Sequence, residues 1–295
     1  MKILHNDQFD INVEIVRNLI KKQFPEFKEL PIFEFDSIGT VNSIFRLGNG
    51  HYIRFPKTKQ YEDSILKEYR ILPYISKHIT LEIPQPIKLG NPCSLYPVHW
   101  AIYNWINGEP YDNNKIVDIQ DIVSELANFI NELHTISLLK DAPKAGRKPL
   151  LELDKMTIDA LNASKEEIKY TKIIKIWNNL VNTSVWNNKP VWIHADLLKP
   201  NILIKDNHIA AIIDFGSAGI GDPAFDLIPA WAIFDKESRN KLQKTLDINE
   251  DTWNRACAYA LHQAALIIPY YRKSNPGFVK QAIDTINEII IDNVS

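Results

Sequence analysis

The alternation of apolar and polar positions divides the chain into a front third rich in short strands and a remainder rich in helices. Apolar residues recur at three- and four-residue spacing in two front segments, which predicts helices over residues 11–20, with Asp10 as the N-cap, and 61–77. Short apolar runs bounded by turn-forming residues predict strands at residues 32–35, 43–47, 51–55 and 99–106. Gly48-Asn49-Gly50 joins two of these strands and is typical of a hairpin turn.

The rest of the chain is predicted to be mainly helical, with a small hairpin inside it. Helical spacing extends over residues 116–134, 151–163, 166–181, 252–268 and 277–291. Two short apolar runs, residues 191–194 and 209–214, interrupt the helices and predict the strands of this hairpin. We therefore expect an α+β protein with an N-terminal lobe over residues 1–106 and a C-terminal lobe over residues 107–295.

Composition narrows the class of protein. Of the 295 residues, 45% are hydrophobic and 24% are charged, as in ordinary globular proteins, which excludes wholesale disorder. The net charge of −2 gives no reason to expect a nucleic acid or an anionic membrane as a partner. Cys93 and Cys257 cannot build a disulfide framework or a four-thiolate metal site. Without a membrane-spanning run or a signal-peptide segment, a cytoplasmic protein is expected.

Two polar motifs follow the strands of the predicted hairpin. Residues 194–201, His-Ala-Asp-Leu-Leu-Lys-Pro-Asn, have the form H-x-D-x-x-x-x-N, and Asp214-Phe215-Gly216 is a D-F-G motif. If each fixed position matches about one time in twenty, both motifs in this order arise by accident in on the order of one in ten thousand chains. Ordinary turn formation would explain each residue singly, but it does not explain the joint spacing.

These residue types fit phosphoryl transfer. Asp196 lies just past a predicted strand, on a loop, where its carboxylate can orient an acceptor hydroxyl and accept its proton. Asn201 and Asp214 offer amide and carboxylate oxygens, which are hard ligands that favour Mg²⁺ over zinc. His194 is expected to be a structural residue that packs under the loop.

The front lobe is then expected to bind the nucleotide. Gly39 and Ser43 belong to a segment that bridges two predicted strands, as a phosphate-covering loop would. Arg54, late in its strand, can reach the phosphates, and Glu68 on the following helix can pair with it; the alternative is an exposed ion pair that contributes little. Backbone groups are expected to bind the base at Tyr103, Asn104, Trp105 and Ile106.

Together these motifs resemble the aminoglycoside phosphotransferase family, small-molecule kinases similar in fold to eukaryotic protein kinases. The matching segments are residues 45–48, 53–56, 67–72, 97–108, 192–196, 214–216, 221–226, 229–231 and 269–271. The resemblance implies a two-lobed protein-kinase-like fold, with a small antiparallel-sheet lobe for ATP or GTP and a larger helical lobe. It implies that Asp196 is catalytic, that Asn201 and Asp214 bind magnesium, and that Asp226 is a buried acid that braces the catalytic loop.

The sequence departs from the family pattern at three positions. Arg54 replaces the usual lysine of the nucleotide lobe, and its guanidinium differs from an ammonium in geometry and hydration. Ala195 replaces a common glycine, and Leu198 replaces a residue that is often histidine.

A small acceptor is expected, because the chain after Gly216 has no room for the peptide platform of protein kinases and no A-P-E signature. Candidate acceptor-binding residues share a location in the second half of the chain: Asp222, Trp231, His262, Tyr270 and Tyr271. A solvated charge or core packing explains each of these five residues equally well.

The leading hypothesis is a kinase that transfers the γ-phosphoryl group of ATP or GTP to a hydroxyl of a small molecule. By resemblance, this molecule is an aminoglycoside-type antibiotic. One alternative is a metabolic kinase that acts on choline, homoserine or an amino sugar. Others are a nucleotide-binding module without transferase activity and, more remotely, a scaffold. The choice between ATP and GTP, the hydroxyl modified and the oligomeric state stay open.

Overall fold

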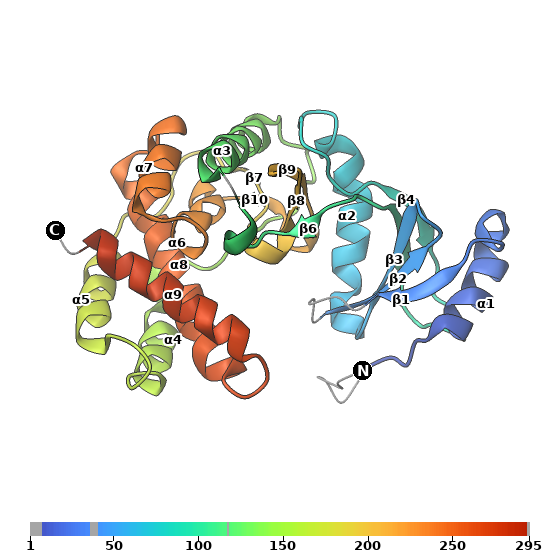
Figure 1. Ribbon diagram of the computed structural model, residues 1–295, viewed down its shortest axis with the longest axis horizontal. Coiled ribbons are helices and arrows are strands. Elements are labelled where there is room, and N and C mark those ends of the chain that lie inside the picture. The colour runs from blue at the N-terminus through green and yellow to red at the C-terminus, as the bar shows by residue number, and fades with distance from the viewer. Residues whose placement is uncertain (1–7, 36–40, 117, 294–295) are drawn as a thin grey trace. The chain divides into compact units, whose positions relative to one another are not determined.

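The computed structural model describes residues 8–35, 41–116 and 118–293 and divides into two compact units (Figure 1). The first, here called the front unit, comprises residues up to Glu109 together with Ala210–Gly216. The second, the helical unit, comprises Pro110–Ile209 and the chain from Ser217 onward. The chain therefore returns to the front unit for one short segment, which contains the D-F-G motif.

The front unit is built on a five-stranded antiparallel sheet with the strand order β1-β2-β3-β5-β4. Its strands are β1 (Ile32–Phe35), β2 (Asn42–Leu47), β3 (His51–Pro56), β4 (Pro86–Gly90) and β5 (Trp100–Asn104). Its helices are α1 (Val13–Gln23) and α2 (Glu62–Ile75). The predicted hairpin between β2 and β3 is confirmed: Leu47 pairs with His51, and Gly48 takes the left-handed conformation with φ +59°.

Side chains alternate across the sheet, and this places one buried cation among apolar strands. Ile53 and Phe55 of β3 belong to an apolar core that also contains Leu19 and Ile20 of α1. Arg54 lies between them in sequence and therefore faces the other side of the sheet, where α2 packs. The predicted N-cap of α1 was wrong. Asn12 caps this helix, with its Oδ1 accepting a hydrogen bond from the Ile15 N–H at 3.0 Å.

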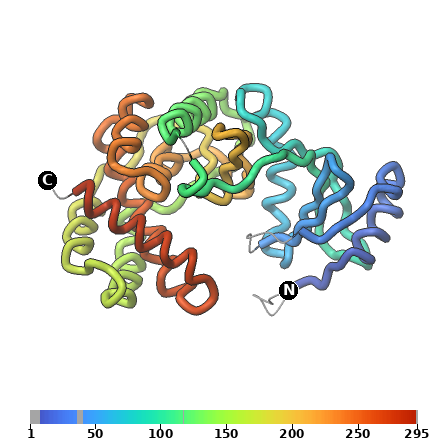
Figure 2. The backbone as a smooth tube through the Cα atoms, in the orientation of Figure 1, coloured from blue at the N-terminus to red at the C-terminus, as the bar shows by residue number. Residues whose placement is uncertain are grey.

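The helical unit contains α3 (Ile119–Thr135), α4 (Leu150–Ala163), α5 (Tyr170–Leu180), α6 (Pro229–Ala232), α7 (Lys236–Thr245), α8 (Glu250–Tyr271) and α9 (Pro276–Asn293). The last two, orange to red in Figure 2, pack along each other, and α8 also packs on α4. The sequence did not predict α7, because its single apolar core residue, Leu242, forms no periodic stripe. Helix α5 begins at Tyr170 rather than at residue 166, because hydrogen-bonded turns occupy the preceding residues.

The remaining strands are short: β6 (Glu109–Pro110), β7 (Val191–Ile193), β8 (Ile202–Lys205), β9 (His208–Ile212) and β10 (Gly219–Gly221). The predicted hairpin joined the wrong strands: β7 pairs with β10, whereas β9 pairs with β8 in a sheet of order β6-β8-β9. Asp206 and Asn207 form the two-residue turn between β8 and β9, and both have positive φ, as a type I′ turn requires. The antiparallel sheet of the front unit and the helices of the other unit confirm the α+β prediction.

Within the described ranges, no helix combines the length and the apolar character needed to cross a membrane.

Candidate active site

A buried ion pair anchors the front unit's part of the candidate site. The Arg54 Nη1 atom lies 2.8 Å from both carboxylate oxygens of Glu68, and the two side chains are only 5% and 1% exposed. Arg54 Nη2 donates to Asp214 Oδ1 at 3.1 Å. Although burial disfavours its charge, the carboxylates of Glu68 and Asp214 hold the pKa of Arg54 well above its usual value. The burial of the pair excludes the alternative of an exposed surface ion pair.

Tyr103 supports this ion pair through its side chain, a role that the sequence reasoning missed. Its hydroxyl donates to Glu68 Oε2 at 2.8 Å, and its ring stacks on that of Tyr52 with centroids 5.2 Å apart. Burial raises the pKa of Tyr103, so the hydroxyl keeps the proton that it donates. The signal in the sequence is an aromatic residue in β5 that the register places opposite β3, two positions from Arg54 in the ladder.

The D-F-G motif follows β9 and turns sharply. Asp214 has φ +63°, a left-handed conformation that aspartate tolerates better than most residues. Its side chain is 41% exposed, and Arg54 holds it on one side. A Cβ atom at Gly216 would lie 3.2 Å from Asp214 Oδ1, so the small third residue of the motif leaves room for this carboxylate.

The residues predicted to contact the base and the phosphates lie in different settings. The N–H groups of Asn104 and Trp105 donate to Gln85 O at 3.1 Å and to Gly50 O at 2.8 Å, whereas the Ile106 N–H has no such main-chain acceptor among the described residues. Ser43 is the second residue of β2 and pairs with Phe55, so it is part of the sheet rather than of a loop. Gly39 lies outside the described residues.

In the helical unit, a buried carboxylate holds the start of the catalytic loop. Asp226 is completely buried, and its two oxygens accept the N–H groups of His194 at 3.1 Å and Ala195 at 2.8 Å. The ring nitrogen Nε2 of His134 lies 3.1 Å from Asp226 Oδ2. Because the Asp226 carboxylate accepts hydrogen bonds from two consecutive backbone N–H groups, it fixes the direction of the chain between β7 and Asp196.

Hydrogen bonds join the residues of the catalytic loop to one another. His194 is completely buried, and its Nδ1 accepts the N–H of Asp196 at 3.3 Å. Asn201 ends a short 3₁₀ turn, and its Nδ2 donates to the main-chain oxygen of Asp196 at 2.9 Å and to the Asp196 carboxylate at 3.0 Å. Because the amide nitrogen of Asn201 is committed to Asp196, its amide oxygen points away from that residue.

The donor atoms can be compared with those that a magnesium ion requires. Asn201 offers an amide oxygen and Asp214 a half-exposed carboxylate, both hard oxygen donors of the kind that Mg²⁺ prefers. Across the described ranges, no group of three His, Cys, Asp or Glu side chains is placed to hold a metal ion. Each of the two side chains by itself therefore offers a donor atom that suits Mg²⁺, an ion that takes few protein ligands together with phosphate oxygens and water.

A family model described as the phosphotransferase enzyme family matches residues 33–260, most of the chain. This chain belongs to the phosphotransferase enzyme family. The predicted resemblance is therefore confirmed, and the structure adds the Tyr103 and His134 contacts that stabilise the family's motif residues.

Solved structures share the fold of this phosphotransferase. A GDP complex of a mutant aminoglycoside 2′-phosphotransferase-IIIa has a TM-score of 0.76 at 18% identity, with 96% of this chain and 98% of that chain covered. A GDP and kanamycin complex of a similar enzyme has a TM-score of 0.70 at 18% identity, covering 94% and 99%. A macrolide 2′-phosphotransferase type I has a TM-score of 0.63 at 14% identity, covering 94% and 98%. These likenesses confirm the kinase-like fold; a search of curated protein sequences gave no match.

Ala195 of this phosphotransferase occupies a strained backbone position, with φ +64°. A Cβ atom in the left-handed region costs about 1–2 kcal/mol, and the greater freedom of glycine in the unfolded chain offsets part of that. We expect Ala195→Gly to raise the free energy of unfolding by about 0.5–1 kcal/mol, measured by urea denaturation. A decrease in the free energy of unfolding would contradict the strain assigned to Ala195.

The candidate acceptor residues differ in burial and in the groups that they contact. Trp231 is buried, with its Nε1 donating to Asp292 at 3.1 Å, and His262 is buried on α8. Tyr270 is 71% exposed, and the ring of Tyr271 packs against Phe278 with centroids 5.2 Å apart. Asp222 accepts a two-point ion pair from Arg255, as described below. His262 therefore lies in the core, because α8 is buried on several faces, and Trp231 of α6 packs against Trp253 of α8 with ring centroids 4.7 Å apart.

His262 is expected to make the stability of the fold depend on pH. Thr157 donates its hydroxyl proton to Leu153 O at 2.8 Å and lies 2.7 Å from His262 Nδ1, which therefore carries the proton of that contact. Burial, together with the charge of Arg147, lowers the pKa of His262 from 6.5 to about 4. Between these values the unfolded chain binds more protons than the folded one, so the free energy of unfolding falls as the pH falls, by about 3 kcal/mol in all.

This pH dependence can be measured by urea denaturation at pH 7 and pH 4.5. The His262→Gln variant keeps an amide donor for Thr157 but does not titrate, so we expect its loss of stability over this range to be smaller. Equal losses in the variant and the natural protein would show that His262 is not the group responsible.

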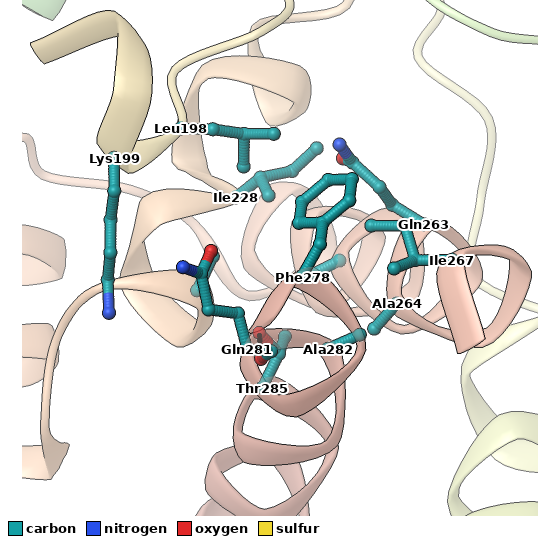
Figure 3. A pocket seen from close by; sticks show the side chains of 12 residues that line it. Leu198, Lys199, Ile228, Gln263, Ala264, Ile267, Phe278, Gln281, Ala282 and Thr285 are labelled. Carbon is teal, nitrogen blue, oxygen red and sulfur yellow. Dashed lines mark hydrogen bonds between the residues drawn. The ribbon is translucent and has the colours of Figure 1, made fainter. Parts of the chain in front are cut away.

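A cavity beside the catalytic loop is shown in Figure 3 and is here called the Leu198 cavity. Leu198 contributes from the catalytic loop, Gln263 from α8, and Phe278 and Gln281 from α9. The apolar side chain of Leu198 makes this part of the cavity wall less polar than it would be with the histidine that the family resemblance leads us to expect at this position.

Proposed function

We propose that this phosphotransferase transfers the γ-phosphoryl group of ATP or GTP to a hydroxyl of a small molecule, and that it acts in the cytoplasm. The observation that carries the proposal is the placement of Asp196. Its carboxylate accepts from Asn201, and its loop is fixed at the backbone by Asp226. Family membership supports the reaction type, and similar solved structures are complexes with GDP, ADP or ATP.

Asp196 is the proposed catalytic base. Its carboxylate orients the acceptor hydroxyl and takes its proton as the oxygen attacks the γ-phosphorus. The amide of Asn201 holds this carboxylate at one oxygen, which reduces the number of orientations open to it before the acceptor arrives.

Arg54 is the proposed phosphate contact in the front unit. Glu68 holds its Nη1 and Asp214 its Nη2, so a guanidinium with five donors still has N–H groups to offer. Tyr103 and Glu68 act on the nucleotide only through Arg54. The backbone of Ile106 is the proposed contact to the base. Ser43 of β2 is a proposed contact to the phosphates, and Gly39, outside the described residues, stays a predicted one.

Asn201 and Asp214 are the proposed magnesium ligands. The ion, when bound with the nucleotide, neutralises negative charge on the phosphate oxygens. The Asp214 carboxylate is held by Arg54, so the same guanidinium that meets the phosphates also orients a metal ligand.

The acceptor class is tested by a panel. Aminoglycosides are the first class proposed, because similar structures are named for them, and a macrolide follows for the same reason. Choline, homoserine and glucosamine represent the metabolic alternatives. Nucleotide consumption is measured with ATP and with GTP, with each acceptor and without any.

We expect consumption that depends on one acceptor class and that is lost in the Asp196→Asn variant. Consumption that no acceptor stimulates, or none with any member of the panel, would contradict the proposal and would favour a nucleotide-binding module.

A further inference from the structure

A second cavity of the helical unit, here called the Arg147 cavity, is walled by aromatic side chains and carries arginine. Its lining includes Arg147, Trp186, Asp222, Phe225, Arg255 and Tyr259. The rings of Phe225 and Tyr259 stack with centroids 4.1 Å apart, and the Arg255 guanidinium lies 5.3 Å from the Trp186 ring. Aromatic walls of this kind fit the face of a ring.

The acid in this cavity is already neutralised. Arg255 donates to the two oxygens of Asp222 at 2.7 and 3.2 Å, and its side chain is 4% exposed. Its remaining donors bind Ser184 O at 3.2 Å and Thr252 Oγ1 at 3.1 Å. Asp222 and Arg255 therefore form a closed structural pair, and neither has its charge available for a ligand.

Arg147 differs from Arg255 in its exposure and in its hydrogen bonding. It is exposed, and within the described part of the chain its guanidinium donates no hydrogen bond. Since Asp222 and Arg255 cancel, Arg147 gives the Arg147 cavity a net formal charge of about +1. An unpaired guanidinium in an aromatic cavity is suited to a carboxylate or another planar anion.

Main-chain hydrogen bonds join the backbone around Arg147 to β10, which pairs with the strand that precedes the catalytic loop. Ala145 N–H donates to Ile220 O at 2.9 Å, and Ile220 N–H donates to Pro143 O at 2.7 Å, so this segment adds to β10. Strand β10 pairs with β7, and β7 leads directly to Asp196. Gly146 has φ +93°, and a Cβ atom there would lie 2.6 Å from the Phe225 ring. Arg147 is thus placed by main-chain bonds.

Main-chain pairing connects the Arg147 segment to the strand that leads to Asp196, because the segment adds to β10 and β10 pairs with β7. Although Arg147 is exposed as a residue, desolvation by its surroundings lowers the pKa of its guanidinium, and the Asp196 carboxylate opposes this effect. A ligand group held by Arg147 would therefore lie on the part of the helical unit that also carries the proposed base.

The lining of the Leu198 cavity, like that of the Arg147 cavity, carries positive rather than negative charge. Lys199 is the charged residue of its lining, beside amides and apolar groups, and no carboxylate of the described chain lines it (Figure 3). Polycationic ligands are bound by carboxylates that are free to pair with them, and neither cavity supplies one.

We infer that Arg147 determines acceptor specificity by binding an anionic group, such as a carboxylate, on the molecule whose hydroxyl is phosphorylated. The aromatic walls formed by Trp186 and Tyr259 then cover an apolar face of that molecule. This inference rests on the proposed function, and within its panel it favours an acceptor that carries a carboxylate, such as homoserine, over the polycationic aminoglycosides.

The experiment compares the binding of three probes by isothermal titration calorimetry. 4-Nitrophenyl β-D-glucuronide and 4-nitrophenyl β-D-glucoside differ by one carboxylate, and kanamycin is a polycation. We expect the natural protein to bind the glucuronide about tenfold more tightly than the glucoside, and kanamycin most weakly.

The variants test whether Arg147 is responsible. In Arg147→Gln the tenfold preference is expected to disappear, and in Arg147→Glu the affinity for kanamycin is expected to rise by about tenfold. The matched control is Lys148→Gln: Lys148 is the next residue, is 72% exposed and is outside the lining of the Arg147 cavity, so the preference should persist. Equal affinity for the two glycosides, binding of neither, or a preference that survives Arg147→Gln would overturn the inference.

Binding and transfer are scored separately. Loss of transfer with an Arg147-dependent preference in binding would reject the proposed reaction but retain the role of Arg147. Transfer to kanamycin that Arg147→Glu leaves unchanged would reject the role of Arg147 and retain the reaction.

Discussion

Replacing Asp196 by asparagine is expected to lower kcat by a factor of about 10²–10⁴ and to leave the Kd for nucleotide unchanged. The substitution removes the carboxylate that accepts the proton of the acceptor hydroxyl. It keeps an oxygen for the bond from Asn201, which measures 3.0 Å, so the loop is expected to keep its conformation. Because the carboxylate acts on the acceptor, nucleotide binding does not depend on it.

The measurement is steady-state transfer with the best acceptor of the panel, together with calorimetric titration of the nucleotide. Asp206→Asn is the matched control, because Asp206 is exposed in the turn between β8 and β9 and its φ of +52° suits asparagine equally well. A kcat for Asp196→Asn close to that of Asp206→Asn would reject Asp196 as the base.

Replacing Glu68 by alanine is expected to lower the free energy of unfolding by about 3–5 kcal/mol. Arg54 would then be left buried, with Asp214 as its remaining anionic partner. The hydroxyl of Tyr103 would also lose its acceptor. If Arg54 is the phosphate contact, the Kd for nucleotide rises in the same variant, because the guanidinium is no longer held.

The exposed pair of Lys155 and Asp159 offers the control, with a similar contact of 2.6 Å but little burial. Asp159→Ala is expected to leave the free energy of unfolding unchanged within error, since exposed ion pairs contribute little. Urea denaturation of the two alanine variants makes the comparison. Similar free energies of unfolding for the two variants would contradict the larger contribution that we assign to the buried Glu68 pair.

The parts of the fold that depend on neighbouring residues could be predicted from the sequence. The hairpin at Gly48 and the strand around Arg54 follow from turn residues and alternation over a few positions. The partner of β7 could not be predicted in this way, because it lies in β10, with the whole catalytic loop and the β8–β9 hairpin between them in sequence. Pairing at such separation is decided by tertiary packing rather than by local pattern.

The residues of the candidate site likewise divide into those that the sequence could predict and those whose contacts depend on tertiary structure. Motif spacing predicted the roles of Asp196, Asn201 and Asp214, which stay predictions, and resemblance predicted that Asp226 braces the catalytic loop; its hydrogen bonds to that loop are seen only in three dimensions. The inferred role of Arg147 could not be predicted from the sequence, because its surroundings are typical of a loop and nothing local shows that this loop adds to β10.

The most direct test of the account is the fate of the γ-phosphoryl group. With [γ-³²P]ATP or [γ-³²P]GTP, magnesium and the acceptor chosen from the panel, the account predicts label in a phosphate monoester of the acceptor, formed by the natural protein and not by Asp196→Asn. Label that remains in the nucleotide, or that appears only as inorganic phosphate at a rate independent of the acceptor, would contradict it.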